Sequence, residues 1–533
     1  MKMLKRAWQW LEKANGIIVI VYTALVLFSH AFLIRVHDTD TQIFQAFFAV
    51  LFISAFLCPQ LLRYAGKKEL YRTAASKPEL RRWFILPFTV TLLFLLFLFI
   101  GYYPGGVSGD TNNQLKQFMS HHYSDWHPVF QTLFSITVPL KLTGSWSGAP
   151  VLFHIILFSL VTAYAVYSIR IYTSPRFAAL TLLFWLINPG TAGINLVIGL
   201  KDATFSAAVL LSLTCALHVY STDGSWLKKP LHLILTIGAL AFTTLVRHNA
   251  ILFTAPLTVA LLPCTARVGT GRKKLRVIIV LGFLISVLVI KLSIPWIFAV
   301  EKPGSRVMET MGLPMNIIAS VAKYDPEAMD EETRAFTEYI ATRDEWEQLY
   351  VYGDYNSLKW HSKTDSEAAE HLGRGKILSM ALRCMRASPR VALTSLIRLT
   401  DPVYTLTDDF YEVTLGSREP IVIYNEIGIT MTGSPLIRNI YHTVSEFMLL
   451  VFPLFVNSNG AMLLLLLIGV LSKKGNKCFI DIKKALLVLP LFIYALGTML
   501  LLTGRGDCYR YYYCTYLSVP PLLAIVFSAP EKR

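Results

Sequence analysis

Four short polar segments interrupt an otherwise apolar sequence, and each carries side chains that could do chemistry. An aspartate can accept a proton from a hydroxyl group, and a lysine or arginine can bind an anion. All four segments lie at the ends of apolar runs, where an ionisable group costs less than at the centre of a membrane. The four are residues 105–127, the pair Lys201 and Asp202, residues 247–249 and residues 505–513.

Asp110 is the strongest candidate for a reacting carboxylate. It stands in a glycine-rich stretch, and glycines let the backbone approach a ligand closely. A purely structural alternative is that Asp110 caps the N-terminus of a short helix. Asp202 has the same ambiguity because it directly precedes a predicted helix, and Arg247 could simply complement a helix C-terminus. Spacing alone leaves both interpretations open for these three residues.

Three histidines follow Asp110 in the first polar segment. His121, His122 and His127 match no standard ligand spacing of a zinc site. Solvated loop histidines are therefore the preferred interpretation. His127 differs from the other two because Pro128 follows it, which favours an extended backbone at the start of a predicted helix.

The last polar segment is both cationic and aromatic. It places Arg505 and Arg510 beside four tyrosines at positions 509 and 511–513. One interpretation is an aromatic belt at the membrane surface, with arginines that extend toward water. The other is recognition of a phosphate group, with which the planar guanidinium can make paired hydrogen bonds. Both interpretations stay open.

Long apolar runs determine the fold class. The chain has 533 residues, of which 54% are hydrophobic and 16% are charged, whereas soluble domains carry roughly 25% charged residues. Lipid cannot hydrogen-bond the backbone, so apolar runs of about 20 residues must cross the membrane as helices. The sequence predicts an all-α integral membrane protein of about 12 spanning helices, within a range of roughly 11–13. Clear examples are residues 84–103, 151–169, 277–300 and 485–503.

Basic residues in short loops set the predicted orientation. The N-terminus and residues 63–82 and 267–276 are rich in lysine and arginine, which marks them as cytoplasmic. Both termini are then cytoplasmic, and the four polar segments fall on the external face. The same loops account for the net charge of +16. Because no basic stripe lies on a soluble face, we exclude nucleic acid as a partner.

Four units are predicted along the chain. A long polar stretch that holds most of the acidic residues separates two groups of apolar runs, and we interpret it as a mainly helical extracytoplasmic insert. The short apolar runs at residues 128–140 and 441–456 are predicted as interfacial helices, the second alternatively as re-entrant. The units are residues 1–82 (a helix pair with a basic cytoplasmic loop), 83–300 (a transmembrane core), 301–440 (the insert) and 441–533 (the last transmembrane helices).

The polar segments belong to a longer series of short motifs. In chain order these are YPGGVSGDTNNQ at residues 103–114, Asp125, His127-Pro128, Pro189, Lys201-Asp202, LVRHN at residues 245–249 and Gly312-Leu313-Pro314. Over residues 83–523 the series resembles a largely uncharacterised family of bacterial multi-pass proteins assigned to the GT-C superfamily of membrane glycosyltransferases. Each motif is short, and their order carries the resemblance.

The resemblance implies a fold, a reaction and a site. GT-C enzymes transfer a sugar from a polyprenyl-phosphate donor on the extracytoplasmic side of the membrane, here to a glycan, lipid or protein acceptor. Residues 83–300 would be the catalytic core, Asp110 the catalytic base, and Asp202 a residue that orders the site or a metal. His127 completes the catalytic candidates. The predicted donor-phosphate ligands are Lys201, Arg247, Arg505 and Arg510, and the predicted substrate-binding residues are Asn113, Gln114, Asp125, His248, Asn249 and Tyr511.

Cofactors and competing functions stay open at this point. The sequence lacks an acidic pair at Asp110, so a metal is undecided, and a divalent cation such as Mg²⁺ or Mn²⁺ is the one cofactor considered. A flippase or transporter of lipid-linked glycans is the main alternative, although no inverted repeat is evident and the ionisable residues gather at one face. A glycan polymerase is the other alternative. The sugar, the acceptor and the oligomeric state are not predicted.

Overall fold

The computed structural model describes most of the chain from residue 75 onward. The described residues are 75–301, 310–359, 368–404, 428–474, 477–502, 504 and 508–527. The predicted spans at residues 16–33 and 42–62 therefore lie outside the described residues, as do Arg505 and most of the predicted N-terminal unit.

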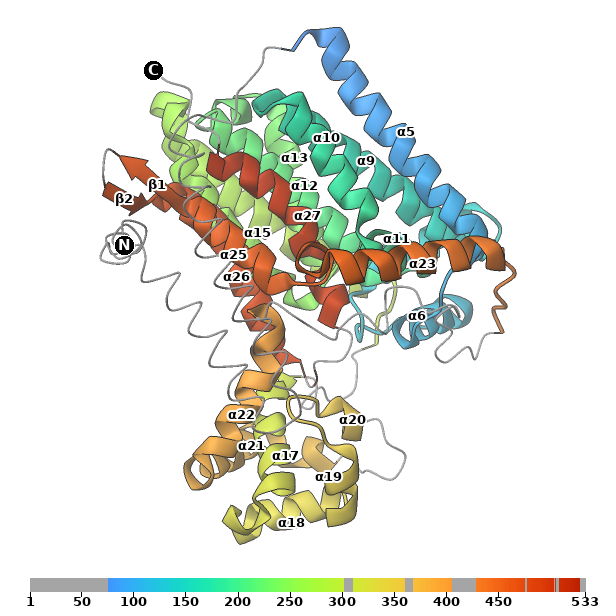
Figure 1. The fold of residues 1–533 in the computed structure, drawn as a ribbon, viewed down its shortest axis with the longest axis vertical. Helices are drawn as coiled ribbons and strands as arrows, with labels where there is room; N and C mark the ends of the chain where they lie inside the picture. Colours follow the sequence, from blue (N-terminus) through green and yellow to red (C-terminus); the bar gives the residue numbers. More distant parts are fainter. Residues whose placement is uncertain are drawn as a thin grey trace.

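A bundle of long apolar helices makes up the larger part of the described chain (Figure 1). Within the described residues, five helices are long and apolar enough to cross a membrane, and a sixth span results if one bent pair is counted as a single span. The chain is thus a multi-pass membrane protein built from α-helices. The five are α5 (Lys77–Tyr102), α9 (Ala149–Tyr172), α12 (Lys201–Ser221), α15 (Arg272–Ile297) and α26 (Ile482–Leu501).

The predicted number of about twelve spans is too high for the described residues. Three predicted spans are helices of only 16, 11 and 12 residues, namely α13 (Pro230–Leu245), α14 (Ile251–Leu261) and α25 (Asn459–Val470). At about 1.5 Å per residue, none of them reaches the roughly 30 Å of a hydrocarbon core. A 3₁₀ turn flanks α14 on each side, so the apolar run in the sequence is longer than the α-helix that it contains.

Helix α12 is the centre of the bundle. In its most apolar stretch 94% of the residues are buried, whereas the corresponding value for α15 is 11%. Around α12 pack α9, α13 and α27 (Cys508–Phe527). Because α15 exposes most of its apolar side chains, it forms a lipid-facing edge of the bundle.

Serine and proline begin several of the helices. Ser76 accepts a hydrogen bond from the backbone N–H of Glu79 at the start of α5, and Ser174 does the same for Phe177 at the start of α10 (Pro175–Ile187). Such caps satisfy amide groups that have no partner within the helix. Asn188 caps the next helix, α11 (Pro189–Asn195), which bends by 57° from α10.

The apolar run at residues 128–140 is mostly buried by protein, and its position at the membrane interface stays a prediction. It forms α7 (Val129–Thr132), the π-helical turn η2 (Leu133–Thr137) and α8 (Val138–Leu142). Most of these residues are covered by protein, and Ser135 pairs with Thr204 of α12 at 2.9 Å. The polar side chains in this run therefore bond inside the bundle.

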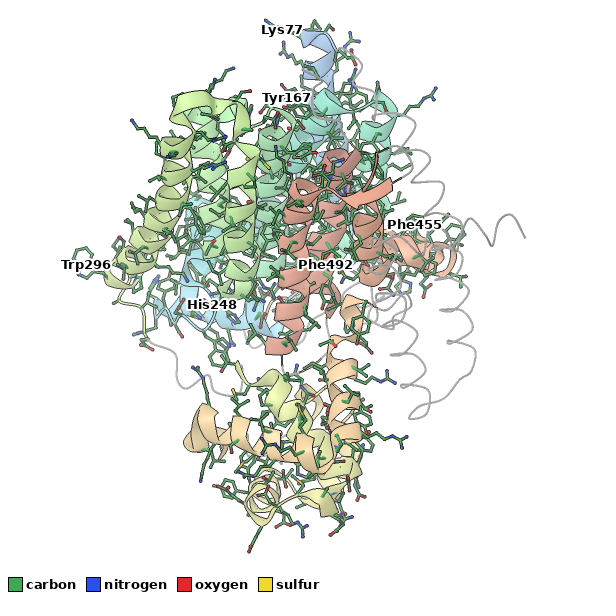
Figure 2. All side chains as sticks on the ribbon, turned by 90° about the vertical axis from the view of Figure 1, so that its left-hand side faces the viewer. Lys77, Tyr167, His248, Trp296, Phe455 and Phe492 are labelled. Atoms are coloured by element: carbon green, nitrogen blue, oxygen red, sulfur yellow. The ribbon has the colours of Figure 1, made fainter. Side chains whose placement is uncertain are left out.

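Basic residues gather at one end of the bundle, as predicted for a single membrane side. Lys77 begins α5, and Figure 2 shows it at the opposite end of the helix bundle from His248. At the basic end Arg170 forms an ion pair with Glu79 at 2.5 Å, and Lys483 forms one with Asp223 at 3.6 Å. The other end carries the polar segments singled out above.

The described part of the insert is helical and has a core of its own (Figure 1). It packs against the end of α26, where Gly312 touches the carbonyl of Leu502 so closely that a side chain would not fit. Gly504 lies so close to the carboxylate of Asp354 that a side chain at this position would clash with it. The insert helices are α17 (Gly312–Tyr324), α18 (Glu331–Ile340), α19 (Arg343–Leu349), α20 (Asn356–Lys359), α21 (Ala368–Ala387) and α22 (Pro389–Thr400).

The C-terminal part returns the chain to the bundle. Helix α23 (Pro435–Val451) crosses the end of α5, and the short α24 (Pro453–Val456) leads into α25. An antiparallel hairpin, with Leu471 opposite Ile480, then joins α25 to α26 and departs from the all-helical pattern. Its strands are β1 (Leu471–Lys474) and β2 (Lys477–Ile480).

Candidate active site

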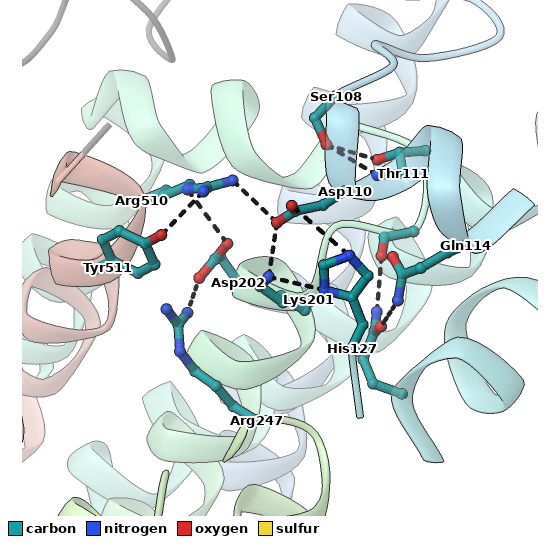
Figure 3. Close-up of polar contacts among 12 residues, drawn as sticks. Ser108, Asp110, Thr111, Gln114, His127, Lys201, Asp202, Arg247, Arg510 and Tyr511 are labelled. Atoms are coloured by element: carbon teal, nitrogen blue, oxygen red, sulfur yellow. Dashed lines mark hydrogen bonds and ion pairs between the residues drawn. The ribbon is translucent and has the colours of Figure 1, made fainter. Parts of the chain in front are cut away.

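Five charged side chains from four parts of the chain meet in one place (Figure 3). We call them the charge cluster. Its members are linked by ion pairs and include three cations and two carboxylates. They are Asp110 of α6 (Gly109–Ser120), Lys201 and Asp202 at the start of α12, Arg247 just after α13, and Arg510 of α27.

Asp110 is a member of the cluster and not a helix cap. Ser108 caps α6 by accepting from the N–H of Thr111, and Asp110 stands in the first helical turn. Its carboxylate lies 2.7 Å from the ammonium of Lys201 and 3.4 Å from a guanidinium nitrogen of Arg510. Burial alone would raise the pKa of Asp110, but the two cations outweigh burial and hold that pKa well below its usual range. Asp110 is therefore ionised at neutral pH.

Asp202 is the inner carboxylate of the cluster. Its side chain is fully buried, whereas that of Asp110 is 25% exposed. Asp202 forms an ion pair with Arg247, and its other oxygen lies 3.9 Å from Arg510. A buried carboxylate needs such partners to stay charged. Of the two carboxylates, only Asp110 is open to a second molecule.

Tyr511 holds the two arginines side by side. The Arg247 guanidinium lies 4.5 Å from the centre of the Tyr511 ring, and that of Arg510 lies 5.0 Å from it. Arg510 also donates a hydrogen bond to the Tyr511 hydroxyl at 3.0 Å. Cation–π contacts of this kind keep cations in place without neutralising them. Phe205, 5.4 Å from Arg247, adds a second aromatic surface.

His127 lies beneath Asp110 and Lys201 and is 3% exposed. Its Nδ1 is 3.3 Å from the Lys201 ammonium, and its Nε2 is 3.8 Å from Asp110. Burial, together with the charge on Lys201, lowers the pKa of His127 to about 3. The ring is therefore neutral, with Nδ1 as acceptor and the proton on Nε2 facing Asp110. The interpretation as a solvated loop histidine is wrong for His127, whereas His121 and His122 are exposed.

Backbone contacts fix the first polar loop to the start of α12. Gly106 donates to the carbonyl of Leu196 and accepts from Ile198, so the two loops run as a short parallel bridge. Thr111 adds a bond to the carbonyl of Ile198 at 2.7 Å. This bridge sets the position of Asp110 relative to Lys201, although the two are far apart in sequence.

Gln114 supports the loop and is not directed at the cluster. Its amide nitrogen donates to Gln131 and, at 2.9 Å, to Thr132 (Figure 3). Gln131 in turn donates to the carbonyl of Gly199 at 2.7 Å. The buried amides thus join α6, α7 and the turn before α12. Asn113 is exposed on the outer side of α6.

The remaining predicted substrate residues form the rim of the cluster. His248 lies 3.2 Å from the carbonyl of Asp125, whose carboxylate accepts from Val129 at the start of α7. Asn249 accepts from Arg247 at 2.8 Å and donates to Thr498 of α26 at 3.0 Å. These contacts position Arg247 and the loop before α7.

Two structural alternatives fail at the cluster. Tyr511, Tyr512 and Tyr513 are buried inside the bundle, so these three tyrosines do not form a lipid-facing belt. Arg247 follows the end of α13, but its side chain pairs with Asp202, so it does more than complement that helix.

A divalent cation does not fit the residues present. Among the described residues no group of three or more histidine, cysteine, aspartate or glutamate side chains could hold a metal ion. Asp110 and Asp202 already face lysine and arginine, and these cations would repel Mg²⁺ or Mn²⁺. We therefore route no chemical step through a metal.

Sequence reasoning did not identify Gln131 and Phe205. Gln131 is a polar residue in an apolar run, and Phe205 follows Asp202 by about one helical turn. Both positions could therefore have been recognised from the sequence as candidates near the site. Comparisons of the chain with protein-family models, with curated proteins and with solved structures found no match. What the site does must therefore follow from its own residues.

Proposed function

We propose that the chain is a GT-C-type glycosyltransferase that moves a sugar from a polyprenyl phosphate to an extracytoplasmic acceptor. The charge cluster is the observation that carries this proposal. It places one accessible carboxylate beside three cations at the end of a membrane bundle, where a phosphate on a lipid carrier would lie. The order of motifs over residues 83–523 supports the same class.

The charges of the cluster favour a donor with one phosphate. Three cations and two carboxylates leave a surplus of one positive charge. A sugar joined to a polyprenyl chain through one phosphate is a phosphodiester with one negative charge, which neutralises that surplus. A diphosphate-linked sugar would bring two negative charges and leave the site anionic, at a cost in a partly buried environment.

The reaction uses the two carboxylates differently. Asp110 accepts the proton as the acceptor hydroxyl attacks the anomeric carbon of the sugar, and the bond between that carbon and the phosphate oxygen breaks. The polyprenyl phosphate then leaves with one more negative charge, which Lys201 and Arg510 stabilise. Asp202 cannot reach the acceptor because it is buried, so it positions Arg247 and Arg510.

Donor binding also increases the basicity of Asp110. In the free site Lys201 and Arg510 hold the pKa of Asp110 well below its usual range, which makes the carboxylate a weak base. A donor phosphate competes with Asp110 for the same two cations. Once they turn to the phosphate, Asp110 becomes a stronger base at the moment when the reaction needs one.

The test is Asp110→Asn, because asparagine keeps the shape of the side chain and Ser108 keeps the helix cap. Membranes with the variant are given polyprenyl-phosphate hexoses labelled in the sugar, and free polyprenyl phosphate is measured. Loss of a general base should slow its release by about 10²- to 10⁴-fold, while donor binding persists. Asp481→Asn, at the cap of α26 on the basic end, is the control and should be fully active.

The same assay separates the proposal from the main alternative. A flippase or transporter would move the labelled donor across the membrane without releasing polyprenyl phosphate. Wild-type membranes that translocate the donor intact would refute the transferase, as would an Asp110→Asn variant that works at the wild-type rate.

A further inference from the structure

Helix α23 presents three different faces. One face, with Tyr441, Ser445 and Met448, is buried against the bundle. A second face carries a row of exposed apolar residues spaced by three or four positions: Leu436, Ile440, Val444, Phe447 and Val451. A third face carries exposed polar residues: Asn439, Thr443 and Glu446. Leu450, which is exposed, stands four positions after Glu446 and ends this polar row with an apolar residue.

The helix cannot be an ordinary spanning or soluble helix. Its 17 residues would extend for about 26 Å, less than the roughly 30 Å of a hydrocarbon core. The polar row from Asn439 to Glu446, in the middle of the helix, would also have to lie in lipid if the helix crossed the membrane. In water, on the other hand, five large apolar side chains would form an exposed stripe of a kind that soluble proteins avoid. The three faces of α23 therefore require three different surroundings, namely protein, hydrocarbon and water.

Contacts place α23 at the end of a membrane-spanning helix. The backbone N–H groups of Thr432 and Ser434 donate to the carbonyls of Tyr103 and Ile100, at 3.0 Å each. Arg438 donates to the carbonyl of Gly101, also at 3.0 Å. The last carbonyls of α5 thus receive their hydrogen bonds from the segment that begins α23, and in Figure 1 α23 runs across the end of α5.

The apolar row is continuous with a lipid-facing surface. Along its last turns α5 exposes Leu93, Phe97 and Ile100, and the carbonyl of Ile100 bonds to Ser434 just before α23. An apolar surface that continues from a spanning helix onto a helix at its end matches acyl chains on one side and water on the other.

From this arrangement we infer that α23 lies in the plane of the membrane, in the leaflet on the side of the insert. The apolar row contacts acyl chains, the polar row faces water, and the third face binds the bundle. Since α23 also caps α5 directly before the loop of Asp110, it fixes the depth of the charge cluster in that leaflet. The inference does not depend on the proposed transferase function.

Photo-crosslinking in native membranes identifies what covers the apolar row. Ile440, Val444 and Phe447 are each replaced by benzoylphenylalanine, and adducts are identified by mass spectrometry after irradiation. Asn439 and Thr443 are replaced in the same way as matched positions on the polar row. We expect phospholipid adducts at all three apolar positions and at least fivefold fewer at the two polar ones.

Three results would overturn the inference. Adducts with peptides from residues 1–74 would mean that the N-terminal segment covers the row, and dimers of the chain would mean that a second copy covers it. Equal lipid labelling of both rows would mean that α23 is immersed rather than in the plane of the membrane.

Discussion

At the scale of single residues, burial separates two aspartates that look equivalent in sequence. Both follow shortly after a turn and both stand in the first turn of a helix. Asp110 remains partly exposed and Asp202 does not, so one can meet a substrate while the other can only orient its neighbours. Arg247, just after the end of α13, reaches Asp202 and pairs with it inside the bundle.

Arg510 makes contacts that lysine cannot reproduce. One guanidinium nitrogen faces Asp110 at 3.4 Å, another faces Asp202 at 3.9 Å, and a third donates to Tyr511. We expect Arg510→Lys to keep the positive charge but to lose the planar set of donors that the guanidinium provides. A charge-assisted hydrogen bond contributes roughly 1.5–3 kcal/mol, so the variant should bind a polyprenyl-phosphate hexose about 10- to 150-fold more weakly. Arg81→Lys, at the exposed start of α5, is the control. Equal affinities of both variants would remove Arg510 from the phosphate site.

The pH profile tests whether the catalytic base is a group with an ordinary histidine pKa. Burial lowers the pKa of His127 to about 3, and the pKa of Asp110 is held well below its usual range, so neither group gains a proton between pH 8 and pH 5. We therefore expect kcat/KM for the donor to show no acid limb in this window. A base with the ordinary histidine pKa would instead give a tenfold loss per pH unit below about 6.5.

At the scale of elements, the site depends on a loop that has no room for side chains. Gly105 has φ +125°, and a Cβ there would lie 2.5 Å from Val151 and 2.9 Å from Ile198. The backbone can make its bridge to residues 196–198 only because glycine stands at this position. The loop, rather than α6 alone, is what places Asp110 opposite Lys201.

Gly105→Ala should therefore damage both the fold and the site. Gly144→Ala is a matched control because Gly144 also has a positive φ, +64°, but a Cβ added there would have no other atom within 4 Å. We expect Gly105→Ala to lower the thermal unfolding midpoint in nanodiscs by several degrees more than Gly144→Ala, and to weaken donor binding at least tenfold. If the two variants had the same unfolding midpoint and the same donor affinity, the structure around residue 105 would accommodate a side chain without loss of stability or binding.

The sequence predicted the helices better than their role in the membrane. The end of α5 was predicted to within one residue, but its start at Lys77 was missed by seven residues because the first turns of the helix are polar and the prediction followed the apolar run at residues 84–103. Membrane crossing is not local: the run at residues 128–140 is apolar because protein covers it. In the same way, Lys201 and Arg510 could be chosen as cations, but their meeting at Asp110 depends on the packing of α12 against α27.

At the scale of the whole molecule, the insert and the charge cluster share one end of the bundle. The insert packs on Leu502 and Gly504, only a few residues before Arg510. A ligand held by the insert would thus lie close to the site, and a shift of the insert would reach α27 directly. This arrangement requires that the insert, the cluster and α23 all lie on the same side of the membrane.

Labelling of introduced cysteines tests which side that is. Glu347→Cys lies on an exposed part of α19, and Arg81→Cys lies at the exposed basic end of α5. The basic loops predict that the α5 start is cytoplasmic and the insert external. In cells with an intact plasma membrane, an impermeant maleimide should label position 347 at once and position 81 only after lysis. Cys215, Cys264, Cys384 and Cys514 are buried, which keeps the background labelling of these four residues low. The reverse pattern would place the charge cluster in the cytoplasm, where the phosphate of an externally displayed lipid-linked sugar cannot reach it.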